Sequence, residues 1–220
     1  MSRHLIVLLI FLRLLIWDAA CHAQTNAVES IGALNDAAVS DAVRKEMELK
    51  GYRIVLEDGK PAYEIWLRKS IPTSDRKDDQ GALYPPLAPP TLVGVISYVR
   101  AGTDYRGQAI RPGYYTLRYQ WIPTDGDHLG VSPNPDFLLL VPAAVDADPT
   151  ASPKFADLVG LSRKATGSKH PGLLSLVQAG SAVPGISKDD QGHSVFSVKL
   201  TLASGKELPI GLIVKGTAPQ

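Results

Sequence analysis

The chain of 220 residues contains a single cysteine, Cys21, which lies at the end of an apolar N-terminal segment. If this segment is removed on export, the mature protein contains no thiol. Disulfide bonds, zinc–thiolate sites and cysteine nucleophiles are then excluded together. The stability of the folded protein must therefore come from burial of apolar side chains, and a chain of this length is long enough to supply it.

The sequence also has no excess of charge of either sign. It contains 23 Lys and Arg against 22 Asp and Glu, with a formal net charge of +1. Proteins that bind nucleic acid through its phosphates carry a basic surplus, so we expect no nucleic acid partner. Removal of Arg3, Arg13 and Asp18 with residues 1–23 leaves 21 charged residues of each sign. This balance also argues against attraction to an acidic membrane surface.

Long hydrophobic runs are absent except at residues 5–17, which are almost entirely apolar. Basic residues precede this run, and a small-x-small pattern at residues 21–23 follows it. The pattern predicts a signal peptide at residues 1–23 and a secreted or periplasmic protein. Because Arg13 interrupts the run and a spanning helix needs about 20 apolar residues, we expect no transmembrane span after signal cleavage. An uncleaved N-terminal anchor is the alternative.

Glycine and proline are frequent, with 19 and 17 residues, which is typical of short strands joined by turns. The clearest strand is predicted at residues 114–121, where Tyr115, Leu117, Tyr119 and Trp121 share one face. Further strands are predicted at residues 52–56, 62–69, 91–100, 105–110, 137–141, 194–202 and 208–215. We therefore expect a mainly β fold, an antiparallel β-sandwich of about seven to eight strands with one or two short accessory helices.

The chain shows no internal repeat and no linker, so we expect a single β-sandwich domain at residues 40–220. Residues 24–39 are small and polar, which predicts a flexible leader. Ser40 is expected to cap a short helix that runs to Leu49. Weaker helical patterns occur at residues 154–164 and 172–179.

Two Asp/His loops are candidates for a metal site. Asp125, Asp127 and His128 lie within four consecutive positions of a glycine-containing loop, and His193 ends a second loop of this kind. Oxygen ligands can hold calcium, and imidazole would admit a transition metal. If these loops and His170 met in the fold, they would form a catalytic metal shell. The alternative is an ordinary turn in which the aspartates accept backbone hydrogen bonds.

Motifs of other enzyme classes are absent from the sequence. It contains neither the Gly-x-Ser-x-Gly nucleophile elbow nor a glycine-rich phosphate loop. Two aromatic residues, Trp66 and Tyr114, are predicted on the strand faces opposite the core, where they could form a stacking platform. The leading hypothesis is an exported non-catalytic module that binds a protein, peptide or glycan without a cofactor. The second is a metal-binding protein or metal-dependent hydrolase that uses the Asp/His loops and a divalent metal.

Residues 111–119, with the sequence Arg-Pro-Gly-Tyr-Tyr-Thr-Leu-Arg-Tyr, resemble a strand of prealbumin-like and carboxypeptidase-regulatory-like modules of exported bacterial proteins. Together with residues 125–128, 132–133, 136–140 and 207–210, they make the chain similar to a group of uncharacterised secreted bacterial β-sandwich proteins. The resemblance implies export and a sandwich fold, and it implies no activity.

Overall fold

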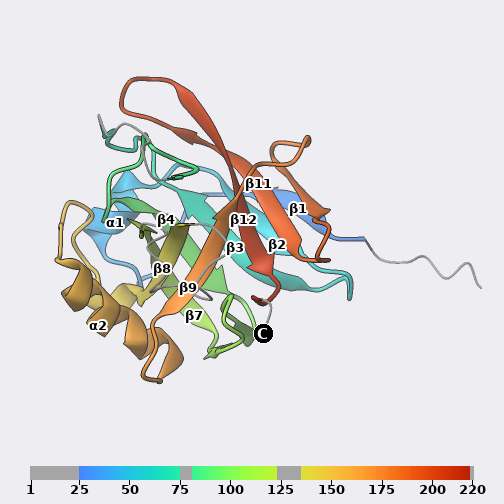
Figure 1. Cartoon of the computed structure of the whole chain (residues 1–220), viewed down its shortest axis with the longest axis horizontal. Helices are drawn as coiled ribbons and strands as arrows, with labels where there is room; N and C mark the ends of the chain where they lie inside the picture. Colours follow the sequence, from blue (N-terminus) through green and yellow to red (C-terminus); the bar gives the residue numbers. More distant parts are fainter. Residues whose placement is uncertain (1–24, 75–80, 123–134, 219–220) are drawn as a thin grey trace, which may run out of the picture.

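The computed structural model describes residues 25–74, 81–122 and 135–218. These residues form one ten-stranded antiparallel sheet, a two-stranded ribbon and two α-helices (Figure 1). The strands of the large sheet are β1 (Ala27–Ile31), β2 (Gly51–Val55), β3 (Pro61–Leu67), β4 (Leu92–Tyr98), β7 (Gly113–Trp121), β8 (Asp136–Pro142), β9 (Gly172–Val177), β10 (Gly185–Lys188), β11 (Ser194–Thr201) and β12 (Glu207–Lys215). The ribbon consists of β5 (Gly102–Thr103) and β6 (Ala109–Ile110), and the helices are α1 (Asp41–Glu46), α2 (Phe155–Thr166) and a 3-10 turn, η1 (Ala143–Val145). None of the helices in these ranges is long and apolar enough to span a membrane.

The large sheet has the strand order β1-β2-β3-β4-β7-β8-β9-β12-β11-β10 and curves until its two edge strands approach each other. Tyr52 of β2 and Phe196 of β11 contact each other inside it, with ring centroids 5.5 Å apart. Asn26 Nδ2, just before β1, donates to Ser194 Oγ at 3.1 Å. The predicted mainly β, antiparallel class is confirmed. The predicted sandwich of seven to eight strands is wrong, because one nearly closed, barrel-like sheet takes its place.

Both faces of this sheet are covered. The inner face encloses the main core, to which eight of the ten strands contribute fully buried side chains and to which Val28 of β1 and Ile186 of β10 add half-buried ones. On the outer face, α2 packs against β8 and β9, with Leu158 buried against Leu139 and Leu173. This explains why residues 137–141 are continuously apolar, as a strand buried on both faces requires.

The segment that precedes α1 covers another part of the outer face. Residues 24–39 were predicted to be a flexible leader, but the described part contains β1, which pairs with β2, and the buried side chains of Leu34 and Val39. These side chains pack with α1 against Trp66 of β3. A five-residue edge strand flanked by isolated apolar residues has too little periodicity to stand out in a sequence.

The predicted helices are partly confirmed. Ser40 caps α1 through its Oγ, which accepts from the Val43 N–H at 3.2 Å, but the helix ends at Glu46 rather than at Leu49. Helix α2 confirms the pattern at residues 154–164. The helix predicted at residues 172–179 is wrong, since this segment forms β9. A short apolar run that is buried on both sides has the same composition in a strand and in a helix.

Candidate functional site

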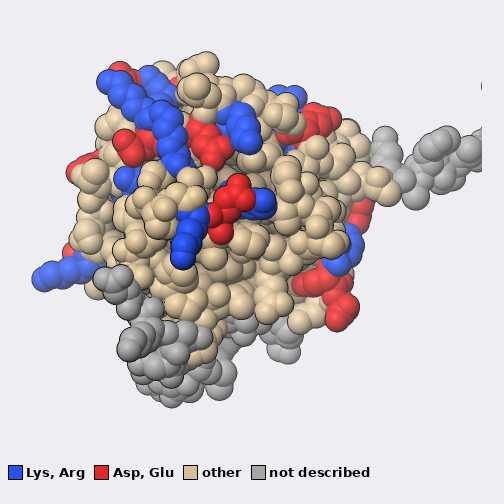
Figure 2. Space-filling model, turned by 90° about the horizontal axis from the view of Figure 1, so that it is seen from above, with Lys and Arg blue, Asp and Glu red and all other residues tan. Residues whose placement is uncertain are grey.

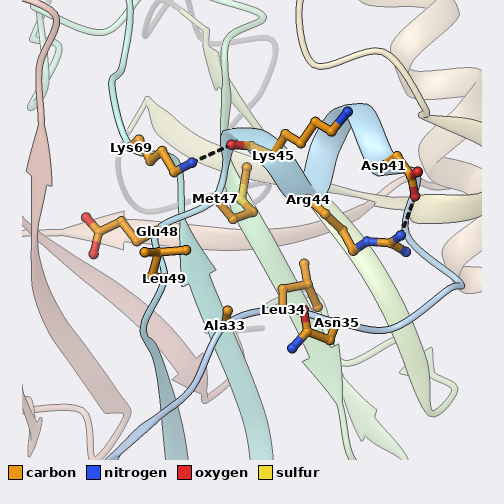
Figure 3. A pocket seen from close by; sticks show the side chains of 10 residues that line it. All are labelled: Ala33, Leu34, Asn35, Asp41, Arg44, Lys45, Met47, Glu48, Leu49 and Lys69. Carbon is orange, nitrogen blue, oxygen red and sulfur yellow. Dashed lines mark hydrogen bonds and ion pairs between the residues drawn. The ribbon is translucent and has the colours of Figure 1, made fainter.

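A hollow of about 480 Å³ lies beside α1 on the outer side of the sheet (Figure 3), and we call it the α1 groove. It is lined by Ala33, Leu34, Asn35, Asp41, Arg44, Lys45, Met47, Glu48, Leu49 and Lys69. One wall comes from the chain that leads out of β1, a second from α1 and the residues after it, and a third from the end of β3. The groove is therefore built largely from the segment in which the sequence predicted a leader and a longer helix.

Local hydrogen bonds explain why the helix stops here and leaves a groove. Met47 forms an isolated antiparallel bridge with Arg68, the Glu48 N–H donates to the Leu67 carbonyl at 2.8 Å, and the Lys69 N–H donates to the Glu46 carbonyl at 2.8 Å. The chain after α1 is thus tied in extended form to the end of β3. Leu34 and Met47, which are 4% and 1% exposed, form the apolar floor between the walls of the groove.

The rim of the α1 groove combines an exposed leucine with charged side chains. Leu49 is 78% exposed, far more than the other large hydrophobic residues of the described chain. Arg44 is occupied, because it pairs with Asp41 and donates to backbone carbonyls. Lys69 Nζ donates to the Lys45 carbonyl at 2.6 Å (Figure 3), and neither lysine has a carboxylate partner among the described residues. Apolar surface and the Lys69 ammonium therefore lie side by side, whereas the Lys45 side chain extends along α1 away from Leu49 (Figure 3).

Glu48 is the remaining carboxyl of the rim. Burial raises the pKa of this carboxyl above its usual value, against the opposing influence of the Lys50 ammonium. Glu48 is thus protonated more readily than a solvated glutamate. On the face seen in Figure 2, basic and acidic side chains are intermixed.

The aromatic platform predicted from Trp66 and Tyr114 is not exposed as a pair. Trp66 is 4% exposed, and its Nε1 donates to the Gly32 carbonyl at 2.9 Å. Tyr114 is half-buried, with its ring centroid 6.4 Å from that of Trp66. The two residues do share the outer face, as the alternation predicted, but the segment before α1 covers the indole. Trp66 supports the floor of the α1 groove from below and cannot stack on a ligand in this structure.

The histidines do not come together in the described chain. His193 is 6% exposed, with Nδ1 2.8 Å from Asp189 Oδ2 and Nε2 3.1 Å from the Thr217 carbonyl oxygen, whereas His170 is exposed after α2. Both ring nitrogens of His193 are thus occupied. In the ranges that the structure describes, no group of three His, Cys, Asp or Glu side chains is arranged to hold a metal ion. Asp125, Asp127 and His128 lie outside the described residues.

The Asp189–His193 contact predicts an acid-sensitive stability. Burial raises the pKa of Asp189, but hydrogen bonds from the His193 backbone N–H and ring outweigh it, so the net pKa lies below the usual value. A carboxyl with a lowered folded-state pKa stabilises the fold above its unfolded pKa and loses that effect as the pH falls through the folded value. We expect Asp189→Asn to melt below the wild type at pH 7, and the difference to shrink below about pH 4. Thermal melts across this range, with the exposed Asp190→Asn as control, measure it; a difference independent of pH would contradict the prediction.

A second buried group holds the loop after β8 against β7. Arg118 is 1% exposed and forms a two-point ion pair with Asp146, with its Nε 2.8 Å from Oδ2 and its Nη2 2.7 Å from Oδ1. Its other N–H groups donate to the carbonyls of Pro90, Asp148 and Ala151. All five donors of the guanidinium are therefore used inside the protein. Arg118 is a structural residue, and the outer face of β7 is covered where it lies.

Asp136 plays a similar part at the start of β8. It is fully buried and accepts hydrogen bonds from the Leu83 N–H at 2.6 Å, the Tyr84 N–H at 3.1 Å and the Tyr119 hydroxyl at 2.5 Å. Burial raises the pKa of Tyr84 to about 12, and its hydroxyl in turn accepts from the Gly211 N–H at 3.2 Å. These contacts anchor the segment before β4 and leave no group of this network free for chemistry on a ligand.

The chain matches no protein-family model, no curated protein and no solved structure. The resemblance to prealbumin-like modules therefore stays a prediction, and the function must be argued from the site alone. Of the residues in the α1 groove, the sequence placed those from Asp41 to Leu49 on a helix and assigned none of them to a site. Nothing in the sequence distinguishes the exposed Leu49 from the buried leucines.

Proposed function

We propose that the protein is an exported, non-catalytic binding module that holds an extended segment of a partner protein in the α1 groove. The observation that carries this proposal is the 78% exposure of Leu49 at the rim of a groove whose floor is formed by Leu34 and Met47. A single exposed leucine is ordinary on a protein surface, but this one lines a groove, where an apolar side chain of a partner can bury it.

The charges of the groove favour an acidic, leucine-containing segment. The lining carries three cations, Arg44, Lys45 and Lys69, against the carboxyls of Asp41 and Glu48, and Asp41 pairs with Arg44. Lys45 and Lys69 have no carboxylate partner among the described residues. A segment with Glu or Asp beside an aliphatic residue would satisfy both features, since its carboxylate meets Lys69 and its aliphatic side chain contacts Leu49. Such rim charges contribute mainly to specificity and to the rate of association.

The lining of the groove supports binding rather than catalysis. Among the described residues that line it, none is a Ser, Thr, Cys or His. Acyl transfer and general acid–base chemistry need a nucleophile or a base held in hydrogen-bond reach of a partner group. Glu48 has no such partner in the lining, so its raised pKa does not indicate a catalytic role.

A methyl NMR titration tests this proposal, because Met47 is one of only two methionines in the sequence. We expect the acidic peptide Ac-Glu-Leu-Glu-Leu-Glu-NH₂ to shift the Met47 methyl resonance saturably and the lysine counterpart Ac-Lys-Leu-Lys-Leu-Lys-NH₂ not to. Leu49→Ser and Lys69→Glu should each weaken binding by about tenfold, which corresponds to about 1.4 kcal/mol.

Val99→Ser is the matched control, because Val99 is 45% exposed and does not line the groove. It should leave the affinity unchanged. Equal shifts with both peptides, or an unchanged affinity for Leu49→Ser, would show that the α1 groove is not the binding site.

A further inference from the structure

A second hollow, of about 270 Å³, lies on the other side of the residues that follow β3, and we call it the Arg68 pocket. Arg68 lines it, whereas the next residue, Lys69, lines the α1 groove. Its walls include Pro72, Pro89, Pro90 and Pro149. Proline has a fixed φ and no backbone N–H, so these walls are stiff, apolar and poor in competing donors.

Two arginines line this pocket, and a count of their donors separates their roles. Arg118 uses every N–H on Asp146 and on backbone carbonyls. Arg68, which is only 9% exposed, meets Glu46 Oε2 from Nε at 3.4 Å and from Nη2 at 3.3 Å. These distances exceed the roughly 2.7–2.9 Å of a strong charge-assisted hydrogen bond. Arg68 Nη1 donates to none of the described groups.

Most of the Arg68 side chain is buried against one loosely placed partner, but its unused Nη1 is not enclosed away from solvent, so a ligand can reach this donor. An anion that enters the pocket would supply the missing acceptor. The apolar walls would strengthen the interaction, because an electrostatic contact is worth more where water is excluded. Stiff walls also reduce the entropy lost when a ligand is fixed. Thr91 and Ser152 line the same pocket and offer hydroxyl donors for a second ligand oxygen.

From this arrangement we propose that the Arg68 pocket binds the carboxylate of a small organic acid, with Arg68 Nη1 as the recognition group. The volume is just below the range of about 300–1,000 Å³ typical of small-molecule sites, which restricts the ligand to a small acid or a single carboxylate-bearing end of a larger one.

The surrounding charges favour a monoanion over phosphate. Asp146 neutralises Arg118, and Glu46 partly neutralises Arg68. Asp148 adds a further negative charge, since hydrogen bonds from the Thr150 hydroxyl and N–H lower its pKa. A doubly charged anion would meet this carboxylate without a second free cation to balance it. This site is independent of the α1 groove and of the function proposed for it.

The test is an NMR titration of the arginine side-chain resonances with propionate, with inorganic phosphate and with sodium chloride at matched ionic strength. We expect saturable shifts at Arg68 with propionate, with a Kd on the order of 1–10 mM, and a response to phosphate no larger than that to chloride. The carboxylate could belong to a small free acid or to a peptide C-terminus, and acetyl-Ala-Ala, tested as the free acid and as the amide, separates the two. Binding of the acid alone would extend the site to peptide C-termini. Binding of neither would restrict it to free small acids.

Two variants with opposite expected effects on propionate binding separate a loss of the site from a loss of folding, because a misfolded variant could not bind more tightly. Arg68→Gln should weaken propionate binding at least tenfold, whereas Glu46→Gln removes the competing carboxylate, which is 42% exposed, and should tighten binding several-fold. Arg163→Gln, at an exposed arginine of α2, should change nothing. The proposal is overturned if propionate produces no saturable shift, if phosphate binds as well as propionate, or if Glu46→Gln leaves the affinity unchanged.

Discussion

Arg118→Met is expected to lower the free energy of unfolding by about 3–5 kcal/mol. The substitution leaves the Asp146 carboxylate at 6% exposure with no cation beside it, and it removes the donors from three backbone carbonyls. The Thr116 hydroxyl, 2.5 Å from Asp146 Oδ2, is then the only side chain of the described protein that we find bonded to this carboxylate. Urea unfolding monitored by tryptophan fluorescence measures the loss.

A double variant separates the charge from the packing. Arg118→Met combined with Asp146→Leu removes the uncompensated carboxylate and should recover at least half of the lost stability, since buried ion pairs can often be replaced by apolar residues at little cost. Arg100→Met is the matched control, because Arg100 pairs with Asp58 on the surface, where such pairs contribute about 0–1 kcal/mol. A double variant no more stable than Arg118→Met would instead assign the loss to the carbonyl contacts of the loop.

Trp66→Ala is expected to destabilise the protein by about 3–5 kcal/mol, the range for deletion of a large buried aromatic side chain. The indole is packed among Leu34, Val43 and Met47, and it also fits closely over Gly51, where a Cβ would lie 2.5 Å from Nε1. Trp66→Phe keeps an aromatic ring but loses the hydrogen bond to the Gly32 carbonyl, so we expect a smaller loss of about 1–2 kcal/mol.

The same pair of variants distinguishes a core residue from a ligand platform. If Trp66 were an exposed stacking residue, Trp66→Ala would leave the midpoint of urea unfolding nearly unchanged, as most surface substitutions do. A near-neutral effect would therefore contradict the burial of this residue beneath the segment before α1. Because this segment also forms one wall of the α1 groove, Trp66→Ala should weaken the binding of the acidic peptide as a secondary effect.

The alternation of side chains predicted most strands but not their closure. The hairpin of β2 and β3, the long strand β7 and the C-terminal pair β11 and β12 all follow a period of two, and the structure has them within a few residues of the predicted bounds. Period two reports only that a strand has two faces. Whether those faces form two packed sheets or the inside and outside of one curved sheet depends on long-range pairing, such as that of β9 with β12.

The sites depend on long-range contacts even more strongly. Leu49 is exposed because the chain after α1 is tied to the end of β3, and Arg68 lines a pocket because the loops at Pro89 and Pro149 meet over it. The residues involved in each case are far apart in the sequence. Trp66 and Tyr114 were placed on the correct face of the sheet, but the sequence did not predict that the segment before α1 covers Trp66. A short polar segment shows no periodicity from which its packing could be inferred.

The sequence by itself determined the absence of a cysteine framework from residue 24 onward, the balanced charge, the mainly β class and the cap at Ser40, because each follows from composition or from contacts within a few residues. Only the tertiary structure decided that ten strands curve into one nearly closed sheet, that the segment before α1 buries Trp66, and that Arg68 is left with unused donors while Arg118 is saturated. The physical reason is that burial and hydrogen-bond satisfaction are properties of what packs against a residue, and the packing partners here come from distant parts of the chain.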